Sequence, residues 1–189
     1  MMLSERYRQA LDFAFDLHRE QQRKGSGVPY MAHLLGVSSL VLEFGGDEDL
    51  AIAGLLHDAV EDQGGLVTAE QIRARFGEKV AGVVLECTDS PSEPRPPWHE
   101  RKQAYLAKLP KVSEGAALVV ACDKLYNLRT IVSDLQSTGD LVWDRFSGGK
   151  AGVIWYYGEL GKHKRAPPVL ARQFAAHLEE LQTFQETAG

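Results

Sequence analysis

The sequence predicts an all-α protein, a single domain of helices packed around a central site. Apolar residues recur at three- and four-residue intervals along most of the chain, as Tyr7, Leu11 and Phe15 do near its start. Glycines and prolines separate these periodic segments, and no alternating strand pattern runs for more than a few residues. Because 189 residues suffice for a sizeable core, we expect residues 1–189 to form one domain.

The first half of the chain divides into helices at its glycines. Glycine follows each of the first four periodic segments, and glycine readily ends a helix. Asp47 is suited to cap the third helix, and Thr68 with Gln71 forms a capping box for the fourth. We therefore expect helices over residues 4–23, 34–44, 48–62, 68–77 and 78–88.

Prolines mark the middle of the chain. Residues 90–97 contain four prolines and cannot be helical, so we expect a loop there that serves as a lid or a rim. The periodic segments that follow predict helices over 98–109, 115–136, 149–162 and 168–186. The apolar segment 153–157 fits either a core or an oligomer interface, and the sequence leaves both open.

Composition excludes several classes of function. A net charge of −5 argues against general affinity for nucleic acid. The N-terminus lacks a signal-peptide pattern, and the apolar runs are too short to span a bilayer. Cys87 and Cys122 stand in apolar surroundings, as reduced core thiols do. We therefore expect a cytoplasmic protein that binds neither nucleic acid nor membrane.

Residues 53–62 carry four groups able to bind or activate: His57, Asp58, Glu61 and Asp62. On one continuous helix these groups would share a polar stripe, since positions three and four apart lie on the same face. Three carboxylates so close would repel one another unless a positive charge lay among them. A divalent metal is the simplest such charge.

Two further segments supply matching groups. His33 stands at the N-terminal edge of a helix, and Asp123 follows the apolar run 116–122, where a carboxylate needs a partner. With His57 and Asp58 they make two imidazoles and two carboxylates, a set suited to Mn²⁺, Fe²⁺ or Zn²⁺. Such a metal would acidify a bound water and polarise a phosphate. Glu61 and Asp62 would then orient or deprotonate that water.

Each residue also has a simpler interpretation. His33 alone could be an ordinary histidine at a helix end, and Asp123 could pair with Lys124 or Arg129. Glu61 and Asp62 could be last-turn residues of a surface helix, although acidic groups there oppose the helix dipole. The combination of all these groups favours the metal site.

The chain resembles the HD-domain metallophosphohydrolases and, more narrowly, the small alarmone hydrolases related to the hydrolase half of RelA/SpoT-type enzymes. Four motifs carry the resemblance in order over roughly residues 5–160, ahead of a C-terminal helix at 168–186. They are His18-Arg-Glu-Gln-Gln-Arg-Lys24, Pro29-Tyr-Met-Ala-His33, Leu55-Leu-His-Asp-Ala-Val-Glu-Asp62 and Asp123-Lys-Leu-Tyr-Asn-Leu-Arg-Thr130.

This resemblance implies an HD-domain helical bundle around a central metal, with a purine nucleotide as substrate. It implies a Mn²⁺ site at His33, His57, Asp58 and Asp123, with the water chemistry carried by Glu61 and Asp62. It implies a nucleotide pocket lined by Arg23, Lys24, Asn127 and Thr130. The expected reaction removes the 3′-pyrophosphate of (p)ppGpp and releases pyrophosphate.

Two departures from the family pattern lie near the expected base pocket. The loop Gly25-Ser-Gly-Val28 is one residue longer than usual, and Tyr126 stands where the family commonly has histidine. They leave the choice between guanine and its adenine analogue (p)ppApp open. Another nucleotide phosphate, such as NADPH or a nucleoside monophosphate, is the alternative substrate. A nucleotide-sensing module without catalysis is the alternative from another class.

Overall fold

The computed structural model describes residues 2–89, 96–163 and 165–186, and the regular elements within these ranges are helical. This confirms the predicted all-α class. In chain order the elements are α1 (Glu5–His18), α2 (Met31–Glu43), α3 (Glu48–Leu56), α4 (Ala59–Asp62), α5 (Gly65–Phe76), α6 (Glu78–Cys87), α7 (Trp98–Lys108), η1 (Leu109–Lys111), α8 (Glu114–Thr138), η2 (Gly139–Arg145), α9 (Gly149–Gly161) and α10 (Pro168–Glu186).

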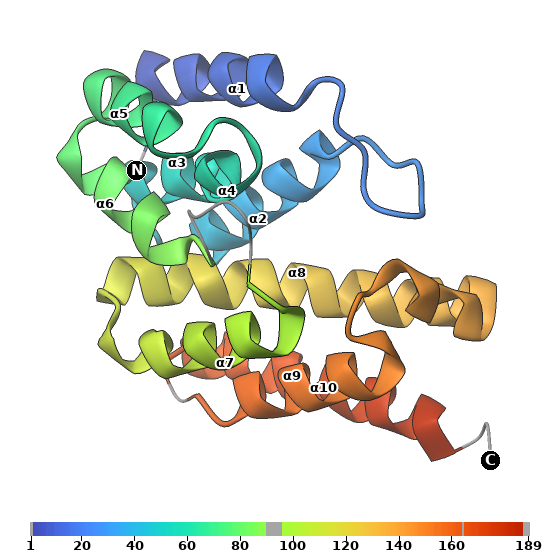
Figure 1. Ribbon diagram of the computed structural model, residues 1–189. Coiled ribbons are helices and arrows are strands. Elements are labelled where there is room, and N and C mark those ends of the chain that lie inside the picture. The colour runs from blue at the N-terminus through green and yellow to red at the C-terminus, as the bar shows by residue number, and fades with distance from the viewer. Residues whose placement is uncertain (1, 90–95, 164, 187–189) are drawn as a thin grey trace.

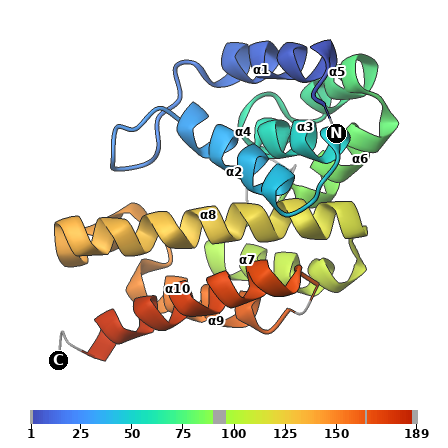
Figure 2. The ribbon, with the colours of Figure 1, turned by 180° about the vertical axis from the view of Figure 1, so that it is seen from behind.

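The long helix α8 organises the molecule. Ser113 caps its first turn by accepting a hydrogen bond from the backbone N–H of Ala116. Helices α1 to α6 lie on one side of α8, whereas α7, α9 and α10 lie on the other, and both views show this arrangement (Figures 1 and 2). Helices α2, α3 and α6 pack directly against α8 from the first side, and α10 packs against it from the second.

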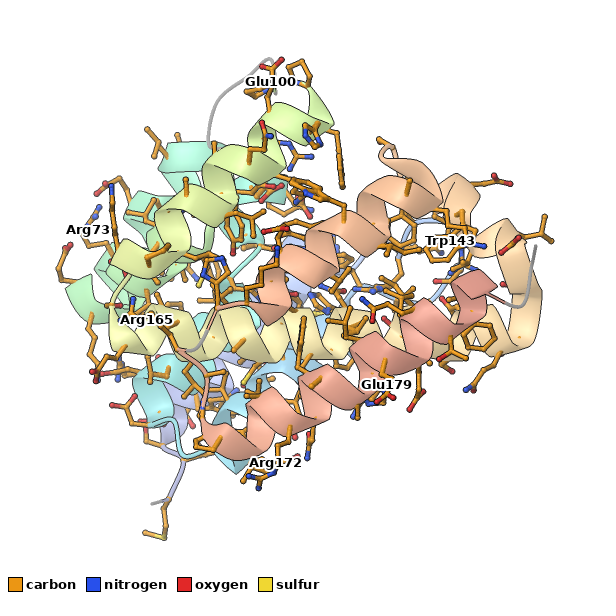
Figure 3. The ribbon with its side chains drawn as sticks, turned by 90° about the horizontal axis from the view of Figure 1, so that it is seen from below. Arg73, Glu100, Trp143, Arg165, Arg172 and Glu179 are labelled. Carbon is orange, nitrogen blue, oxygen red and sulfur yellow. The ribbon has the colours of Figure 1, made fainter. Side chains whose placement is uncertain are left out.

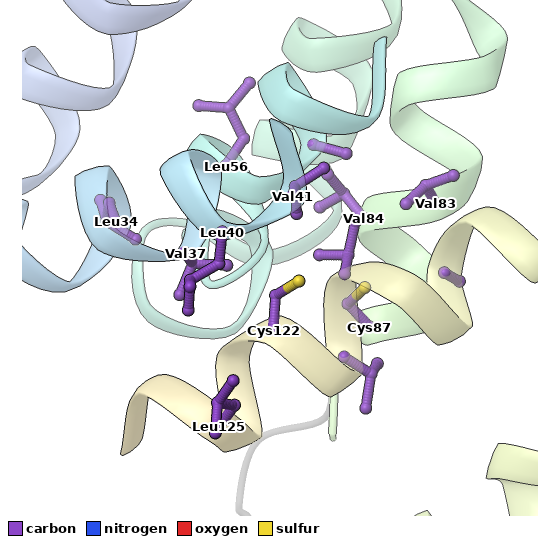
Figure 4. Close-up of a cluster of buried hydrophobic side chains, with 14 of the residues drawn as sticks. Leu34, Val37, Leu40, Val41, Leu56, Val83, Val84, Cys87, Cys122 and Leu125 are labelled. Atoms are coloured by element: carbon purple, nitrogen blue, oxygen red, sulfur yellow. The ribbon is translucent and has the colours of Figure 1, made fainter. Parts of the chain in front are cut away.

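The core between the first group of helices and α8 contains the two thiols. Cys87 and Cys122 lie among Leu34, Val41 and Val84, all of them buried (Figure 4). Both cysteines are free, as expected of reduced core residues. Burial raises the pKa of the Cys122 thiol to about 12, so this thiol stays protonated.

The second layer covers the opposite face of α8. Figure 3 shows it from below, with α10 lying across α8 and Arg172 on its outer side. Val153, Tyr156 and Tyr157 of α9 are buried in this layer. The segment 153–157 therefore contributes side chains to the core.

The predicted helix over 48–62 is wrong, because the structure divides it into α3 and α4. Asp47 caps α3 as predicted, accepting a hydrogen bond from the N–H of Leu50. The helix then stops at Leu56, and the backbone of Asp58 has φ −97° and ψ −4°, well away from the φ of about −63° and ψ of about −42° of a regular helix. The expected polar stripe therefore does not form on one continuous helix.

Two predicted boundaries also need correction. The first helix ends at His18, not at residue 23, because Arg23 N–H donates to Val28 C=O and Tyr30 N–H donates to Gln21 C=O. This backbone pairing overrides the helix propensity of residues 19–23. The fourth helix starts at Gly65, and the Thr68 hydroxyl donates to the Gln63 carbonyl instead of capping.

In the described ranges no helix is long and apolar enough to cross a membrane. Most of the predicted loop at 90–97 lies outside the described residues, since the structure describes only 96 and 97 of it. That loop's role as a lid stays a prediction, as does the expectation that the whole chain forms one domain.

Candidate functional site

Four predicted side chains meet between α8 and the helices above it. His33 comes from the first turn of α2, and His57 and Asp58 form the junction between α3 and α4. Asp123 comes from the middle of α8. Both histidines and Asp123 are buried, and the side chain of Asp58 is 22% exposed.

Their polar atoms converge closely. His33 Nε2 lies 3.2 Å from His57 Nε2, and Asp58 Oδ2 lies 3.0 Å from the latter nitrogen and 3.4 Å from the former. Asp123 Oδ1 lies 3.3 Å from His33 Nε2 and 3.6 Å from His57 Nε2. The bend at the α3–α4 junction allows the adjacent His57 and Asp58 to point to one spot, which a continuous helix would prevent.

The donor set fits a metal ion. His57 Nδ1 donates to the Gly54 carbonyl at 2.8 Å, so in the neutral ring Nε2 carries a lone pair. That lone pair faces two carboxylate oxygens and a second imidazole nitrogen, an arrangement that needs a cation. His33, His57 and Asp58 offer ligand atoms within 4.8 Å of one another.

Electrostatics in the protein alone lead to the same conclusion. Burial alone would raise the pKa of Asp58, but protonated His57 beside it holds that pKa well below its usual range. Burial also opposes the protonation of His57, but Asp58 and Asp123 raise the pKa of its imidazole well above the usual value. The site therefore holds positive charge strongly, whether it comes from a proton or from a metal.

Asp123 combines the two alternatives that the sequence left open. Its Oδ2 accepts a hydrogen bond from Lys124 Nζ at 2.6 Å, so the salt bridge exists. Its Oδ1 faces the histidines and also accepts from Asn127 Nδ2 at 2.5 Å. These two bonds fix the carboxylate so that one oxygen points into the site.

Tyr30 is a site residue that the sequence analysis missed. Its hydroxyl donates to Asp58 Oδ2 at 2.6 Å, and its ring stacks on His18 with centroids 5.5 Å apart. The signal was present, because Tyr30 precedes His33 by three residues and so lies on the same face. Gln21 continues this chain of contacts, donating to Asp62 Oδ2 at 2.9 Å.

Glu61 and Asp62 have different partners. Glu61 Oε2 accepts a hydrogen bond from the Asp89 N–H at 3.2 Å, and Glu61 Oε1 lies 3.8 Å from Arg101 Nη1. Burial raises the pKa of Glu61, and the neighbouring carboxylates Asp58 and Asp89 raise it further. Such a carboxylate retains a proton at higher pH than an exposed one does.

The predicted nucleotide-pocket residues lie beside the four converging groups. Arg23 Nη2 donates to Asn127 Oδ1 at 2.9 Å and to Thr130 Oγ1 at 3.2 Å. Arg23 and Thr130 line a small cavity that reaches His33, and with Lys24 they line a neighbouring one of about 220 Å³. Sequence reasoning missed two other residues of the larger cavity, Arg145 and Phe146.

The two departures from the family pattern border these cavities. Tyr126 lines the smaller one, and its hydroxyl donates to the Ala32 carbonyl at 3.1 Å. Gly25 has φ 74°, in the left-handed region, and a Cβ there would lie 2.5 Å from Arg145 Cγ. The loop 25–28 therefore needs glycine both for its turn and to leave room for Arg145.

Comparisons with known proteins identify the family to which the chain is similar. The sequence model of the HD domain family matches residues 10–154. The guanosine-3′,5′-bis(diphosphate) 3′-pyrophosphohydrolase MESH1 of Homo sapiens is 40% identical over 126 residues, covering 65% of this chain and 68% of its own length. The relative of the same name from Drosophila melanogaster is 35% identical over 143 residues, covering 74% and 75%.

A solved structure is similar over the whole chain. It is described as a metazoan ortholog of SpoT that hydrolyzes ppGpp and plays a role in starvation responses. It superimposes with a TM-score of 0.67 at 28% identity, covering 100% of this chain and 98% of its own.

Proposed function

The chain belongs to the HD domain family of hydrolases, and on that premise we propose that it is a Mn²⁺-dependent guanosine-3′,5′-bis(diphosphate) 3′-pyrophosphohydrolase. The proposed reaction breaks the bond between the ribose 3′-oxygen and phosphorus. Water supplies the oxygen that phosphorus gains, and the products are pyrophosphate and a nucleotide with a free 3′-hydroxyl.

One observation carries this proposal. Four donor atoms converge: His33 Nε2, His57 Nε2, Asp58 Oδ2 and Asp123 Oδ1. Each of the two imidazole nitrogens lies 3.0 to 3.6 Å from each of the two carboxylate oxygens. Two nitrogen and two oxygen donors suit a borderline ion such as Mn²⁺ better than Mg²⁺ or Ca²⁺. We propose these four residues as the metal ligands, and the bound ion would lower the pKa of a water and polarise the phosphate.

Glu61 and Asp62 are the proposed groups for the water chemistry. Glu61 is largely buried, and its raised pKa brings this carboxyl closer to the neutral range in which a general base works best. Asp62 accepts a hydrogen bond from Gln21, which fixes the orientation of its carboxylate. In this proposal one of the two takes the proton of the attacking water, and the departing 3′-oxygen gains a proton as the bond breaks.

The cavities beside the metal ligands are the proposed nucleotide pocket. Arg23 is held by Asn127 and Thr130, and a guanidinium fixed in this way suits a phosphate or the face of a base. Lys24 adds positive charge to the larger cavity, whose lining also includes Phe146 and the ion pair of Arg145 with Asp134. This combination of an aromatic ring and cations is what a purine nucleotide requires.

A substrate panel tests the proposal. Guanosine-3′,5′-bis(diphosphate), its adenine analogue and NADPH are each incubated with Mn²⁺ or with chelator, and anion-exchange chromatography identifies the products. The proposal predicts Mn²⁺-dependent release of pyrophosphate from the guanosine compound, and the adenine rate measures base selectivity. Phosphate release from NADPH, without turnover of either bis(diphosphate), would disprove the proposed substrate but would still show that the protein is a hydrolase.

A further inference from the structure

A second group of charged side chains lies on α7 and α8. Three lysine ammonium groups surround the ring of the buried Tyr105 on α7. Nζ of Lys102, Lys108 and Lys124 lie 5.9, 5.5 and 5.3 Å from its centroid. These lysines belong to α7 and α8, so the fold and not local sequence brings their charges together.

Arg101 extends this cluster toward the candidate centre. Its guanidinium pairs with Asp89, to which Lys102 also donates at 2.6 Å. Arg101 Nη1 lies 3.8 Å from Glu61 Oε1, and Lys124 contacts Asp123 at 2.6 Å. The cluster of Arg101, Lys102, Lys108 and Lys124 thus contacts two residues already assigned to the proposed reaction.

The charges of this cluster do not balance. The Asp89 carboxylate accepts hydrogen bonds from both Arg101 and Lys102, and Lys108 donates to the Thr88 carbonyl. Asp123, the partner of Lys124, would share its charge with a bound metal. Among the side chains that the structure describes, four cations therefore face three carboxylates, Asp89, Glu61 and Glu86, once the metal is present.

Burial makes this excess of positive charge costly. The side chains of Arg101, Lys102 and Lys124 are only 15–17% exposed. Burial lowers the pKa of Lys102, and repulsion from Lys124 lowers it further. Arg101 Nε is buried without a hydrogen-bond partner in the described part of the chain. An anion that bridges these groups would remove both costs.

We propose that this cluster is a second phosphate subsite, which binds the terminal phosphate of the 3′-pyrophosphate. The inference rests on the proposed function and adds a reason for its selectivity. A pyrophosphate attached at the metal extends one phosphate beyond the reacting phosphorus, whereas a 3′- or 2′-monophosphate ends there. Lys102 is the residue we assign to recognising this additional phosphate, with Arg101 beside it.

Binding of inorganic pyrophosphate to the Mn²⁺-loaded protein tests the subsite without turnover. Lys102→Met removes the charge and keeps the length of the side chain, and Asp89 retains Arg101 as its partner. Lys102→Arg restores the charge. Lys111→Met makes the same chemical change at an exposed lysine of η1 and serves as the control. Orthophosphate, titrated in parallel by calorimetry, measures binding at the metal alone.

The subsite predicts that Lys102→Met weakens pyrophosphate binding about tenfold and changes orthophosphate binding by less than about twofold. Lys102→Arg and Lys111→Met should then bind both anions as the wild type does. Unchanged pyrophosphate affinity in Lys102→Met would overturn the proposal. So would an equal loss for both anions, because a merely structural role of Lys102 makes no distinction between them.

Turnover separates this inference from the proposed function. If the protein hydrolyses the bis(diphosphate), Lys102→Met should raise the KM for this substrate and leave the KM for the matching 3′-monophosphate unchanged. Hydrolysis of the bis(diphosphate) with an unchanged KM in Lys102→Met would disprove the subsite and leave the proposed function standing. Selective loss of pyrophosphate binding in a protein without any 3′-pyrophosphohydrolase activity would support the subsite and disprove the function.

Discussion

Lys124 Nζ lies 2.6 Å from Oδ2 of Asp123, the carboxylate whose other oxygen faces His33 and His57. A neighbouring residue on the same helix thus selects which oxygen of Asp123 faces the proposed metal site. Because Oδ2 is hydrogen-bonded to Lys124, only Oδ1 faces that site, and Asn127 orients this oxygen further. Contacts of this kind around a metal ligand commonly change metal affinity by one to two orders of magnitude.

Replacing Lys124 by methionine should therefore weaken Mn²⁺ binding. The variant frees Oδ2 of Asp123 and removes the charge that holds the carboxylate in place, so we expect the dissociation constant to rise about tenfold. Isothermal titration calorimetry, in which Mn²⁺ is added to protein stripped of metal by a chelator, gives this dissociation constant. Lys111→Met, at an exposed lysine, is the control, and equal affinities in the two variants would refute the role of Lys124.

Tyr30→Phe should also weaken metal binding while the fold persists. The variant removes the 2.6 Å hydrogen bond to Asp58 Oδ2 and keeps the ring that stacks on His18. A hydrogen bond to a charged group contributes about 1.5–3 kcal/mol, so a loss of about tenfold or more in Mn²⁺ affinity is expected. Tyr7→Phe removes a hydroxyl bound to Ser38 Oγ at 2.8 Å and should leave the affinity unchanged.

Gly25→Ala should impair nucleotide binding more than it impairs stability. Gly25 and Gly45 both have positive φ, so alanine at either position strains the backbone by about 1 kcal/mol or more. Only at Gly25 would the new Cβ meet Arg145, because nothing lies within 4 Å of it at Gly45. We expect similar falls in unfolding free energy and a raised KM for Gly25→Ala alone. A raised KM for the nucleotide in both variants would contradict the assignment of the cavity beside Gly25 as the nucleotide pocket.

Glu61 should make the stability of the metal-free protein depend on pH. Burial raises its pKa above the ordinary value of 4.5, so the folded state binds this proton more tightly than the unfolded state. Stability is therefore lost as pH rises from that ordinary value through the raised one. Urea unfolding in chelator should show the wild type losing stability relative to Glu61→Gln over this range. A difference that stays constant with pH would contradict the assignment.

The sequence was informative about which residues meet and less informative about how they meet. His33, His57, Asp58 and Asp123 were predicted to meet, because together they supply two imidazoles and two carboxylates, a donor set suited to a metal. The expected route through one helical stripe was wrong. The break between α3 and α4 at His57 and Asp58 depends on packing between helices, which propensity along a single segment does not report.

Arg145 and Phe146 show the same limit. Their side chains reach the candidate site from a segment whose helical pattern stops near them, so periodicity placed no constraint on their direction. Arg145 enters the pocket region because Gly25 leaves it space, a relation across 120 positions that no local motif contains. The capping box at Thr68 failed because Gly64 and Gly65, both with positive φ, turn the chain into α5 earlier.

The central claim is that the four converging ligands hold a metal that drives 3′-pyrophosphate hydrolysis. Its most direct test is a Mn²⁺ titration of the chelated protein in the presence of guanosine-3′,5′-bis(diphosphate), with released pyrophosphate measured by anion-exchange chromatography. We predict no release before metal is added, a rise that saturates near about one Mn²⁺ per chain, and no activity in His57→Ala. Release that persists in chelator, or in His57→Ala, would contradict the account.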